Sequence, residues 1–191
     1  DPLTGEAVEV LWVKGSGGDV GTMKLDGFST LYMEKLRVLK GIYRGLEFED
    51  EMVGLLPHCT LKLYPRAASI YTPLHAYVPR AHVDHMHADA IIAIAASKDS
   101  KALTAEIFGD EIGRLPWKRP GFELGLWLET FCVENPEAKG VVLESHGLFT
   151  WGDDAKSCYE TTIAVINRAI DWLDEKTAGV PAFGGQRVVS L

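Results

Sequence analysis

The chain alternates between two kinds of hydrophobic pattern, and this alternation predicts its secondary structure. Short runs rich in apolar and β-branched residues are typical of strands, and we expect strands at residues 6–14, 82–87, 111–115, 140–144 and 148–151. Apolar residues three or four positions apart, with polar residues between them, are typical of amphipathic helices. We expect helices at residues 28–40, 50–56, 88–97, 121–133 and 153–175.

Two helices carry finer predictions. Thr72 followed by Pro73 is typical of a helix start, with Thr72 as the N-cap and Pro73 at the first helical position. This helix must be brief because Pro79 follows it. The helix over residues 153–175 is the longest that we predict. Its expected buried face consists of Ile163, Ile166, Ile170 and Leu173.

The order of these elements predicts the fold class. The strands at 140–144 and 148–151 form a predicted hairpin around Ser145-His146-Gly147. Strands and helices mixed in this order predict a three-layer α/β/α sandwich. At 191 residues, the chain has the length of one domain, covering residues 1–191. It begins without Met, and we expect it to be a fragment of a longer protein.

Composition narrows the classes of partner. The formal net charge of −8 disfavours nucleic acid or an anionic membrane as the main partner, although a local basic pocket for one phosphate is compatible with it. No run approaches the roughly 18 apolar residues of a membrane span. The cysteines are odd in number and widely spaced, which argues against a disulfide framework and predicts a cytoplasmic location. They are Cys59, Cys132 and Cys158.

Three histidines form a candidate metal site. His85 and His87 lie two apart in a predicted strand and therefore point to the same face, whereas a helix would splay them by about 200°. His146 ends an apolar strand just before Gly147, where it is well mounted as a third ligand. Three neutral imidazoles with an open position are typical of catalytic zinc, with manganese, cobalt or iron as alternatives. Spacing alone also allows His146 to be a turn residue bonded to backbone.

Other polar groups near these segments have both plain and functional interpretations. Gly15, Ser16 and Gly17 form a loop whose backbone N–H groups and hydroxyl are able to approach an anion, although most such loops are turns. The loop lacks the Gly-x-Gly-x-x-Gly spacing of a dinucleotide site. Asp84 lies beside the histidine pair, but strand alternation turns it away from their face.

Three segments together resemble the class II aldolase/adducin family. They are residues 12–17 (Trp-Val-Lys-Gly-Ser-Gly), 82–90 (His-Val-Asp-His-Met-His-Ala-Asp-Ala) and 144–152 (Glu-Ser-His-Gly-Leu-Phe-Thr-Trp-Gly). They look closest to the aldolase half of bifunctional rhamnulose-1-phosphate aldolase/alcohol dehydrogenase proteins. The resemblance implies a central mixed, largely antiparallel sheet and usually a homotetramer. It also implies zinc bound by His85, His87 and His146.

The resemblance further implies a substrate site, from which the sequence departs in two ways: it lacks the family's N-terminal Gly-Asn-x-Ser segment, and it carries a different residue at the catalytic position. The phosphate of a small phosphorylated sugar would lie on Gly15, Ser16, Gly17 and Ser69. The family has a catalytic acid/base glutamate four residues before a histidine, and here Tyr71 stands four before His75. With an ordinary pKa near 10, tyrosine is a poor base at neutral pH but is able to donate a proton or a hydrogen bond.

The implied function is reversible aldol cleavage in rhamnose metabolism. A ketose 1-phosphate similar to rhamnulose 1-phosphate would give dihydroxyacetone phosphate and an aldehyde, with the metal as Lewis acid and Tyr71 in part of the acid/base work. A metal-dependent epimerase, dehydratase or decarboxylase of the same fold is the first alternative, because Tyr71 replaces the glutamate. The second is a non-catalytic adducin-like domain, against which the three histidines argue.

Overall fold

The computed structural model describes residues 1–181 and divides the chain into two compact units. Unit 1 holds Asp1–Pro79 and Lys118–Pro136, and unit 2 holds Arg80–Trp117 and the chain from Glu137 onward. Both units are therefore built from segments distant in the sequence. The single domain over residues 1–191 stays a prediction.

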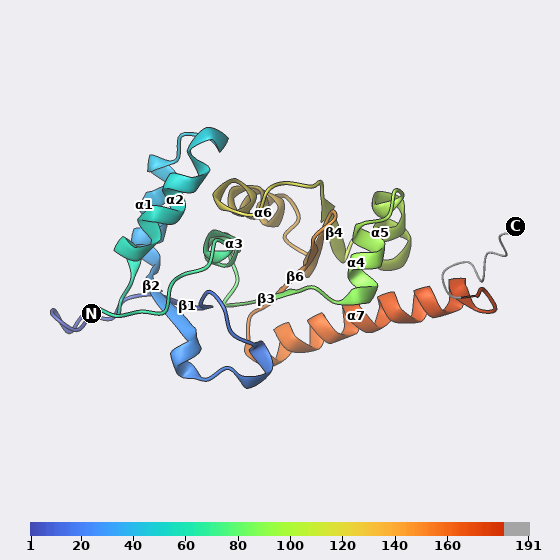
Figure 1. Ribbon diagram of the computed structural model, residues 1–191, viewed down its shortest axis with the longest axis horizontal. Coiled ribbons are helices and arrows are strands. Elements are labelled where there is room, and N and C mark those ends of the chain that lie inside the picture. The colour runs from blue at the N-terminus through green and yellow to red at the C-terminus, as the bar shows by residue number, and fades with distance from the viewer. Residues whose placement is uncertain (182–191) are drawn as a thin grey trace, which may run out of the picture. The chain divides into compact units, whose positions relative to one another are not determined.

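Unit 1 combines a two-stranded sheet with four α-helices (Figure 1). The strands β1 (Val10–Lys14) and β2 (Phe28–Tyr32) pair in antiparallel fashion, with Val10 opposite Tyr32. The helices are α1 (Met33–Ile42), α2 (Glu49–Leu55), α3 (Thr72–Tyr77) and α6 (Phe122–Glu134). Short 3₁₀ turns cover Val20–Thr22, Leu25–Gly27, Leu46–Phe48 and Leu56–Cys59.

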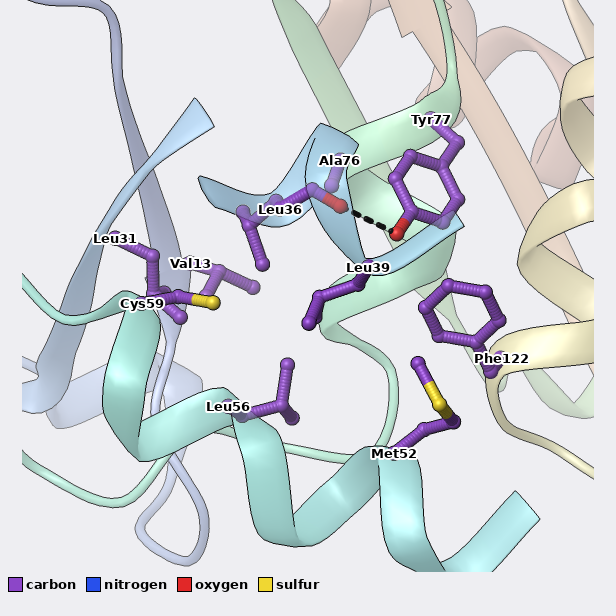
Figure 2. Close-up of a cluster of buried hydrophobic side chains, with 10 residues drawn as sticks. All are labelled: Val13, Leu31, Leu36, Leu39, Met52, Leu56, Cys59, Ala76, Tyr77 and Phe122. Atoms are coloured by element: carbon purple, nitrogen blue, oxygen red, sulfur yellow. Dashed lines mark hydrogen bonds between the residues drawn. The ribbon is translucent and has the colours of Figure 1, made fainter. Parts of the chain in front are cut away.

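Every one of these α-helices and both strands contribute to one hydrophobic core (Figure 2). Leu31 and Leu36 are fully buried in it, and the Tyr77 hydroxyl donates a hydrogen bond of 2.9 Å to the Leu36 carbonyl. Gly125 of α6 lies against α3, where a Cβ would come within 2.9 Å of the Pro73 Cβ. Each fully buried leucine stabilises the fold by roughly 1.5–3 kcal/mol. Because β1 and α3 both contribute residues to this core, the core fixes the ends of the loops that follow β1 and precede α3.

Unit 2 is built on a four-stranded sheet in the order β3-β6-β5-β4. The strands are β3 (His82–Met86), β4 (Ile112–Leu115), β5 (Gly140–Leu143) and β6 (Gly147–Gly152). β6 is antiparallel to both β3 and β5, and β4 is parallel to β5. The predicted α/β class with a central mixed, largely antiparallel sheet is confirmed, as is the β5–β6 hairpin.

The helices of unit 2 are α4 (Asp89–Ala95), α5 (Ser100–Phe108) and α7 (Ala155–Thr177). The Asp154 side chain caps α7 by accepting from the Ser157 N–H at 2.9 Å. Within residues 1–181, no helix is both long enough and apolar enough to cross a membrane. The three cysteines are buried thiols, with Cys59 and Cys132 in unit 1 and Cys158 in unit 2.

The predicted buried face of α7 is wrong at Ile163 and Ile170, whereas Ile166 is half-buried and packs against the core of unit 2, and Leu173 is half-buried. Ile163 and Ile170 are 39% and 41% exposed, and the buried residues are Cys158, Thr162, Val165 and Ala169. The sheet presents polar side chains to this helix: the Thr162 hydroxyl donates to Asp84 at 2.8 Å and lies 2.6 Å from the Thr150 hydroxyl. A face of smaller, partly polar residues satisfies these groups, whereas a row of isoleucines would leave them without hydrogen bonds.

Four other features of the elements also differ from the prediction. Residues 28–40 do not form one helix, because Phe28–Tyr32 is strand β2 and α1 begins at Met33. Aromatic, threonine and leucine side chains in this segment fit a strand paired with β1. Thr72 is not an N-cap: Tyr71 holds that position and Thr72 is the first helical residue, fully buried. Helix α5 was not predicted, and the strand predicted from residue 6 begins at Val10.

Candidate metal site and substrate loop

His85, His87 and His146 converge in unit 2. One ring nitrogen from each lies within 4.8 Å of the others, and the Nε2 atoms of His85 and His87 are 2.9 Å apart. The centroid of the His146 ring is 5.0 Å from that of His85 and 5.1 Å from that of His87. Nitrogen ligands about 2.0–2.1 Å from a tetrahedral zinc lie about 3.4 Å apart, so small rotations of these rings suffice for one shared ion.

Strand β3 and its partner β6 orient His85. Its ring stacks on Phe149, with centroids 4.1 Å apart, and its Nδ1 lies 3.1 Å from the Leu148 carbonyl oxygen. A carbonyl only accepts, so Nδ1 carries the proton and donates, and Nε2 carries the lone pair on the side of His87. Metal-binding histidines are commonly oriented by such a bond. Nothing in the sequence pattern identified Leu148 or Phe149 in this role.

The β5–β6 turn holds His146. Its backbone N–H donates to the Leu143 carbonyl at 3.1 Å, and Ser145 adopts a left-handed φ of 54°. The Ser145 N–H donates to the Ala95 carbonyl at 2.8 Å, which ties the turn to α4. Burial, and then the charge of nearby His87, lower the pKa of His146. Both effects favour the neutral imidazole that binds metal.

Gly147 allows the close approach between this turn and the end of β3. A Cβ at this position would lie 2.7 Å from the His87 Cδ2 and 2.7 Å from the Met86 carbonyl oxygen. Real Cβ atoms do not come that close. The Met86 carbonyl belongs to the backbone of strand β3, so it cannot rotate away as a side chain would. Position 147 therefore excludes every residue but glycine if His87 is to stay in the cluster.

The two carboxylates beside the histidines serve other contacts. Asp84 accepts from Thr162 on the opposite face of β3, which confirms the predicted alternation. Glu144 pairs with Arg114 at 2.5 Å and accepts from the Trp117 N–H at 2.8 Å. Both carboxylates are thus engaged with their own partners in unit 2, and the three imidazoles form the donor set.

Backbone hydrogen bonds fix the glycine loop of unit 1, which comprises Gly15, Ser16, Gly17 and Gly18. The Gly15 N–H donates to the Gly27 carbonyl at 2.9 Å, and the Ser16 N–H donates to the Ala67 carbonyl at 2.8 Å. Gly17 has a φ of 73°, which is the left-handed region that favours glycine. Two of the N–H groups that we expected to face an anion are therefore used inside the protein.

Two cationic side chains on this loop were missed by the sequence analysis. The Lys14 Nζ donates to the Gly17 carbonyl at 2.9 Å, and the Arg66 Nε donates to the Ser16 carbonyl at 3.1 Å. Lys14 directly precedes Gly15, so the sequence alone was sufficient to identify it as a cation of this loop. Arg66 lies 50 residues from Ser16, so only the fold brings it there.

Ser69 and Tyr71 lie at the start of α3. The Ser69 hydroxyl accepts from the Tyr71 N–H at 3.2 Å. Tyr71 is half-buried, and burial raises the pKa of its hydroxyl above the ordinary value. Its protonated form is thereby favoured, so Tyr71 suits the donation of a proton better than its removal. The roles of Tyr71, Ser69 and the glycine loop stay predictions.

Residues 5–171 match the family described as Class II Aldolase and Adducin N-terminal domain, and the chain belongs to this family. The predicted resemblance to class II aldolases is confirmed. A relative in Bacillus subtilis (strain 168), the uncharacterized oxidoreductase YuxG, is 40% identical over 187 residues. That match covers 98% of this chain but 27% of YuxG, so the chain spans about a quarter of that relative.

One solved structure supports the same family, and a second shares the fold. The N-terminal class II aldolase domain of a conserved protein from Thermoplasma acidophilum is 31% identical, with a TM-score of 0.78. That match covers 87% of this chain and 76% of the other. A sugar-phosphate aldolase from Thermotoga maritima is 14% identical with a TM-score of 0.62, over 91% of this chain and 75% of the other, and it shares the fold.

Proposed function

We propose that this chain is a metal-dependent aldehyde-lyase that cleaves a ketose 1-phosphate, similar to rhamnulose 1-phosphate, into dihydroxyacetone phosphate and an aldehyde. The observation that carries the proposal is the convergence of His85, His87 and His146 in a member of the class II aldolase family. The proposal includes a role in rhamnose metabolism, a cytoplasmic location and a homotetramer. These follow from the resemblance and from cysteine usage.

The donor set fits a catalytic divalent metal. Three imidazoles supply three ligands and leave a coordination position open, which is typical of catalytic zinc, with manganese, cobalt and iron as alternatives. The lowered pKa of His146 and the Leu148 bond of His85 favour the neutral, correctly oriented rings that a metal requires. When bound, the metal supplies a Lewis acid for charge that develops on the ketose oxygen.

The family resemblance assigns phosphate binding and proton transfer to residues other than the histidines. We assign the phosphate to the loop of Gly15, Ser16 and Gly17, and to Ser69. Tyr71 is assigned proton donation, because its raised pKa keeps the hydroxyl protonated at neutral pH. The base that removes the proton from the substrate hydroxyl is not assigned to Tyr71.

A second candidate is a metal-dependent epimerase, dehydratase or decarboxylase with the same site. Tyr71 favours it, since a tyrosine stands where the aldolases of the family carry a carboxylate. A non-catalytic adducin-like role is disfavoured by the histidine cluster, for which such a role offers no use. YuxG is named as an oxidoreductase, which is a different activity. We propose that this activity belongs to the part of YuxG that the present chain does not match.

The proposal is tested by product analysis with purified, zinc-loaded protein. Rhamnulose 1-phosphate and its stereoisomers are supplied one at a time, and dihydroxyacetone phosphate is measured with a coupled assay. We expect cleavage that a chelator abolishes and added zinc restores, and no cleavage by His146→Ala. Conversion without release of dihydroxyacetone phosphate would favour the second candidate, and retention of full activity by His146→Ala would overturn both.

A further inference from the structure

Two cationic side chains on the glycine loop of unit 1 lie within ion-pair distance of no carboxylate among the described residues. Among the described residues, neither Lys14 nor Arg66 forms an ion pair, although acidic residues outnumber basic ones 27 to 19 in this chain. Exposed arginines elsewhere in unit 1 do find partners, such as Arg44, which pairs with Glu51 at 2.6 Å. Unpaired cations in an acidic protein are candidates for binding an anionic ligand.

Arg66 lies along the loop in close contact with its glycines. A Cβ at Gly15 would come within 2.6 Å of the Arg66 Cγ and 2.7 Å of its Cδ. A Cβ at Gly18 would lie 3.2 Å from the Arg66 Nη2, and one at Gly17 would lie 3.5 Å from the same atom. The missing side chains thus let the guanidinium reach the Gly17–Gly18 end of the loop.

Two of the backbone donors of the loop are already used inside the protein. The N–H groups of Gly15 and Ser16 are used by backbone carbonyls. The hydrogen bond from Arg66 to the Ser16 carbonyl uses only its Nε. A guanidinium carries four further N–H donors on its two terminal nitrogens. Those donors form a planar fork that matches the oxygens of a phosphate and binds them in pairs.

We propose that Arg66 binds the phosphate group of the substrate and is the residue that selects phosphorylated over neutral ketoses. The inference rests on the proposed function, since it names a further residue of that substrate site. It adds to the phosphate-binding loop a side chain 50 residues away in the sequence, which supplies donors beyond those of the glycine pattern.

The experiment compares Arg66→Gln and Arg66→Lys with the unchanged protein. Isothermal titration measures the affinity for dihydroxyacetone phosphate and for dihydroxyacetone at equal metal content. Arg44→Gln is the control, because it removes one exposed positive charge from unit 1 and gives the same change in net charge. Thermal unfolding of each variant measures whether the loop has lost its structure.

We expect Arg66→Gln to weaken binding of dihydroxyacetone phosphate by about tenfold or more, since charged hydrogen bonds to phosphate are strong. Binding of dihydroxyacetone should stay the same. Arg66→Lys should recover part of the affinity because it keeps the charge without the fork. The affinity of the unchanged protein should fall with added salt more steeply than that of Arg66→Gln.

Equal affinity of Arg66→Gln and the unchanged protein for dihydroxyacetone phosphate would overturn the inference. So would an equal loss for dihydroxyacetone, or a loss that only accompanies a lower unfolding temperature, since either outcome shows that Arg66 holds the loop. The proposed function fails separately: Arg66-dependent phosphate binding without cleavage of any ketose 1-phosphate would leave the anion site standing and remove the aldolase.

Discussion

Tyr71 is the residue on which the chemistry of this chain departs most from the aldolases that it resembles. A carboxylate at this position would accept a proton at neutral pH. A half-buried tyrosine with a raised pKa instead holds its proton. Under the proposed function, Tyr71 therefore donates a proton, and another group is the proton acceptor.

Replacing Tyr71 by phenylalanine tests this role. Tyr71→Phe removes the hydroxyl and keeps the ring, so we expect kcat to fall by about 10²–10⁴ while the bound metal stays the same. Steady-state kinetics and elemental analysis provide the two measurements. Tyr71→Glu is the companion variant and restores the carboxylate of the family. Unchanged kcat in Tyr71→Phe would remove Tyr71 from the reaction.

Gly147 illustrates what the sequence reveals about the metal site and what it does not. The alternation of a strand predicts that His85 and His87 share a face, and a glycine turn after a strand end points to His146. These three residues could therefore be predicted from the sequence. The contact between Gly147 and the His87 ring, and the bond from His85 to Leu148, depend on how β3 pairs with β6. That pairing is set by residues about 60 positions apart.

We expect Gly147→Ala to weaken zinc binding by about tenfold or more, because the added methyl group displaces the His87 ring or the Met86 carbonyl. Competition with a chromophoric chelator measures the affinity. The control is Gly54→Ala in α2, where an added Cβ meets nothing within 4 Å. That variant should bind zinc normally and be slightly more stable, by about 0.5–1 kcal/mol. Normal zinc affinity in Gly147→Ala would contradict the close approach.

Among the secondary-structure elements, α7 and β2 show where local pattern loses to tertiary contacts. Isoleucines at helical spacing predict an apolar buried face, yet the face in contact with the sheet carries Cys158, Thr162 and Ala169. The reason is a polar group on the other partner, Asp84, which no pattern within the helix reveals. In the same way, residues 28–32 join a strand because β1 is available to pair with them. Most other elements, including the hairpin, follow their local pattern.

Thr162 should therefore contribute more to the free energy of unfolding than the burial of its small side chain alone would. Thr162→Val keeps the shape but leaves Asp84 and the Thr150 hydroxyl without this partner, and we expect the free energy of unfolding to fall by about 1–3 kcal/mol. Urea unfolding followed by circular dichroism measures the change. Thr161→Val is the matched control, because it makes the same substitution at a neighbouring, partly exposed position. A similar loss in both variants would argue against the buried polar contact.

In the molecule taken as a whole, the proposed metal ligands come from distant segments of the chain, since His146 lies 59 positions after His87. An unfolded chain does not hold them together, so a metal that binds them stabilises the folded state. At a metal concentration about 100 times the dissociation constant, this linkage amounts to about 2.7 kcal/mol. A metal bound at the proposed site would thus stabilise unit 2 as well as serve the proposed reaction.

Removal of metal is expected to lower the unfolding temperature, and zinc added back is expected to raise it again. Differential scanning calorimetry with and without a chelator measures the shift. His146→Ala should unfold at the same temperature in both conditions, because it has lost one of three ligands. A chelator that leaves the unchanged protein unaffected would mean that the histidines hold no ion in solution.

The buried thiols also give each unit its own reporter. Cys59 and Cys132 lie within unit 1 and Cys158 lies within unit 2, all closed off from solvent. A thiol reagent will therefore modify them only when the surrounding unit opens. Mass spectrometry of the labelled cysteines will time the opening of the histidine-bearing unit through Cys158, and that of the substrate loop's unit through the other two. If zinc slows labelling of Cys158 more than labelling of Cys59, the two units open independently, and the rate of Cys158 labelling reports the metal occupancy of unit 2.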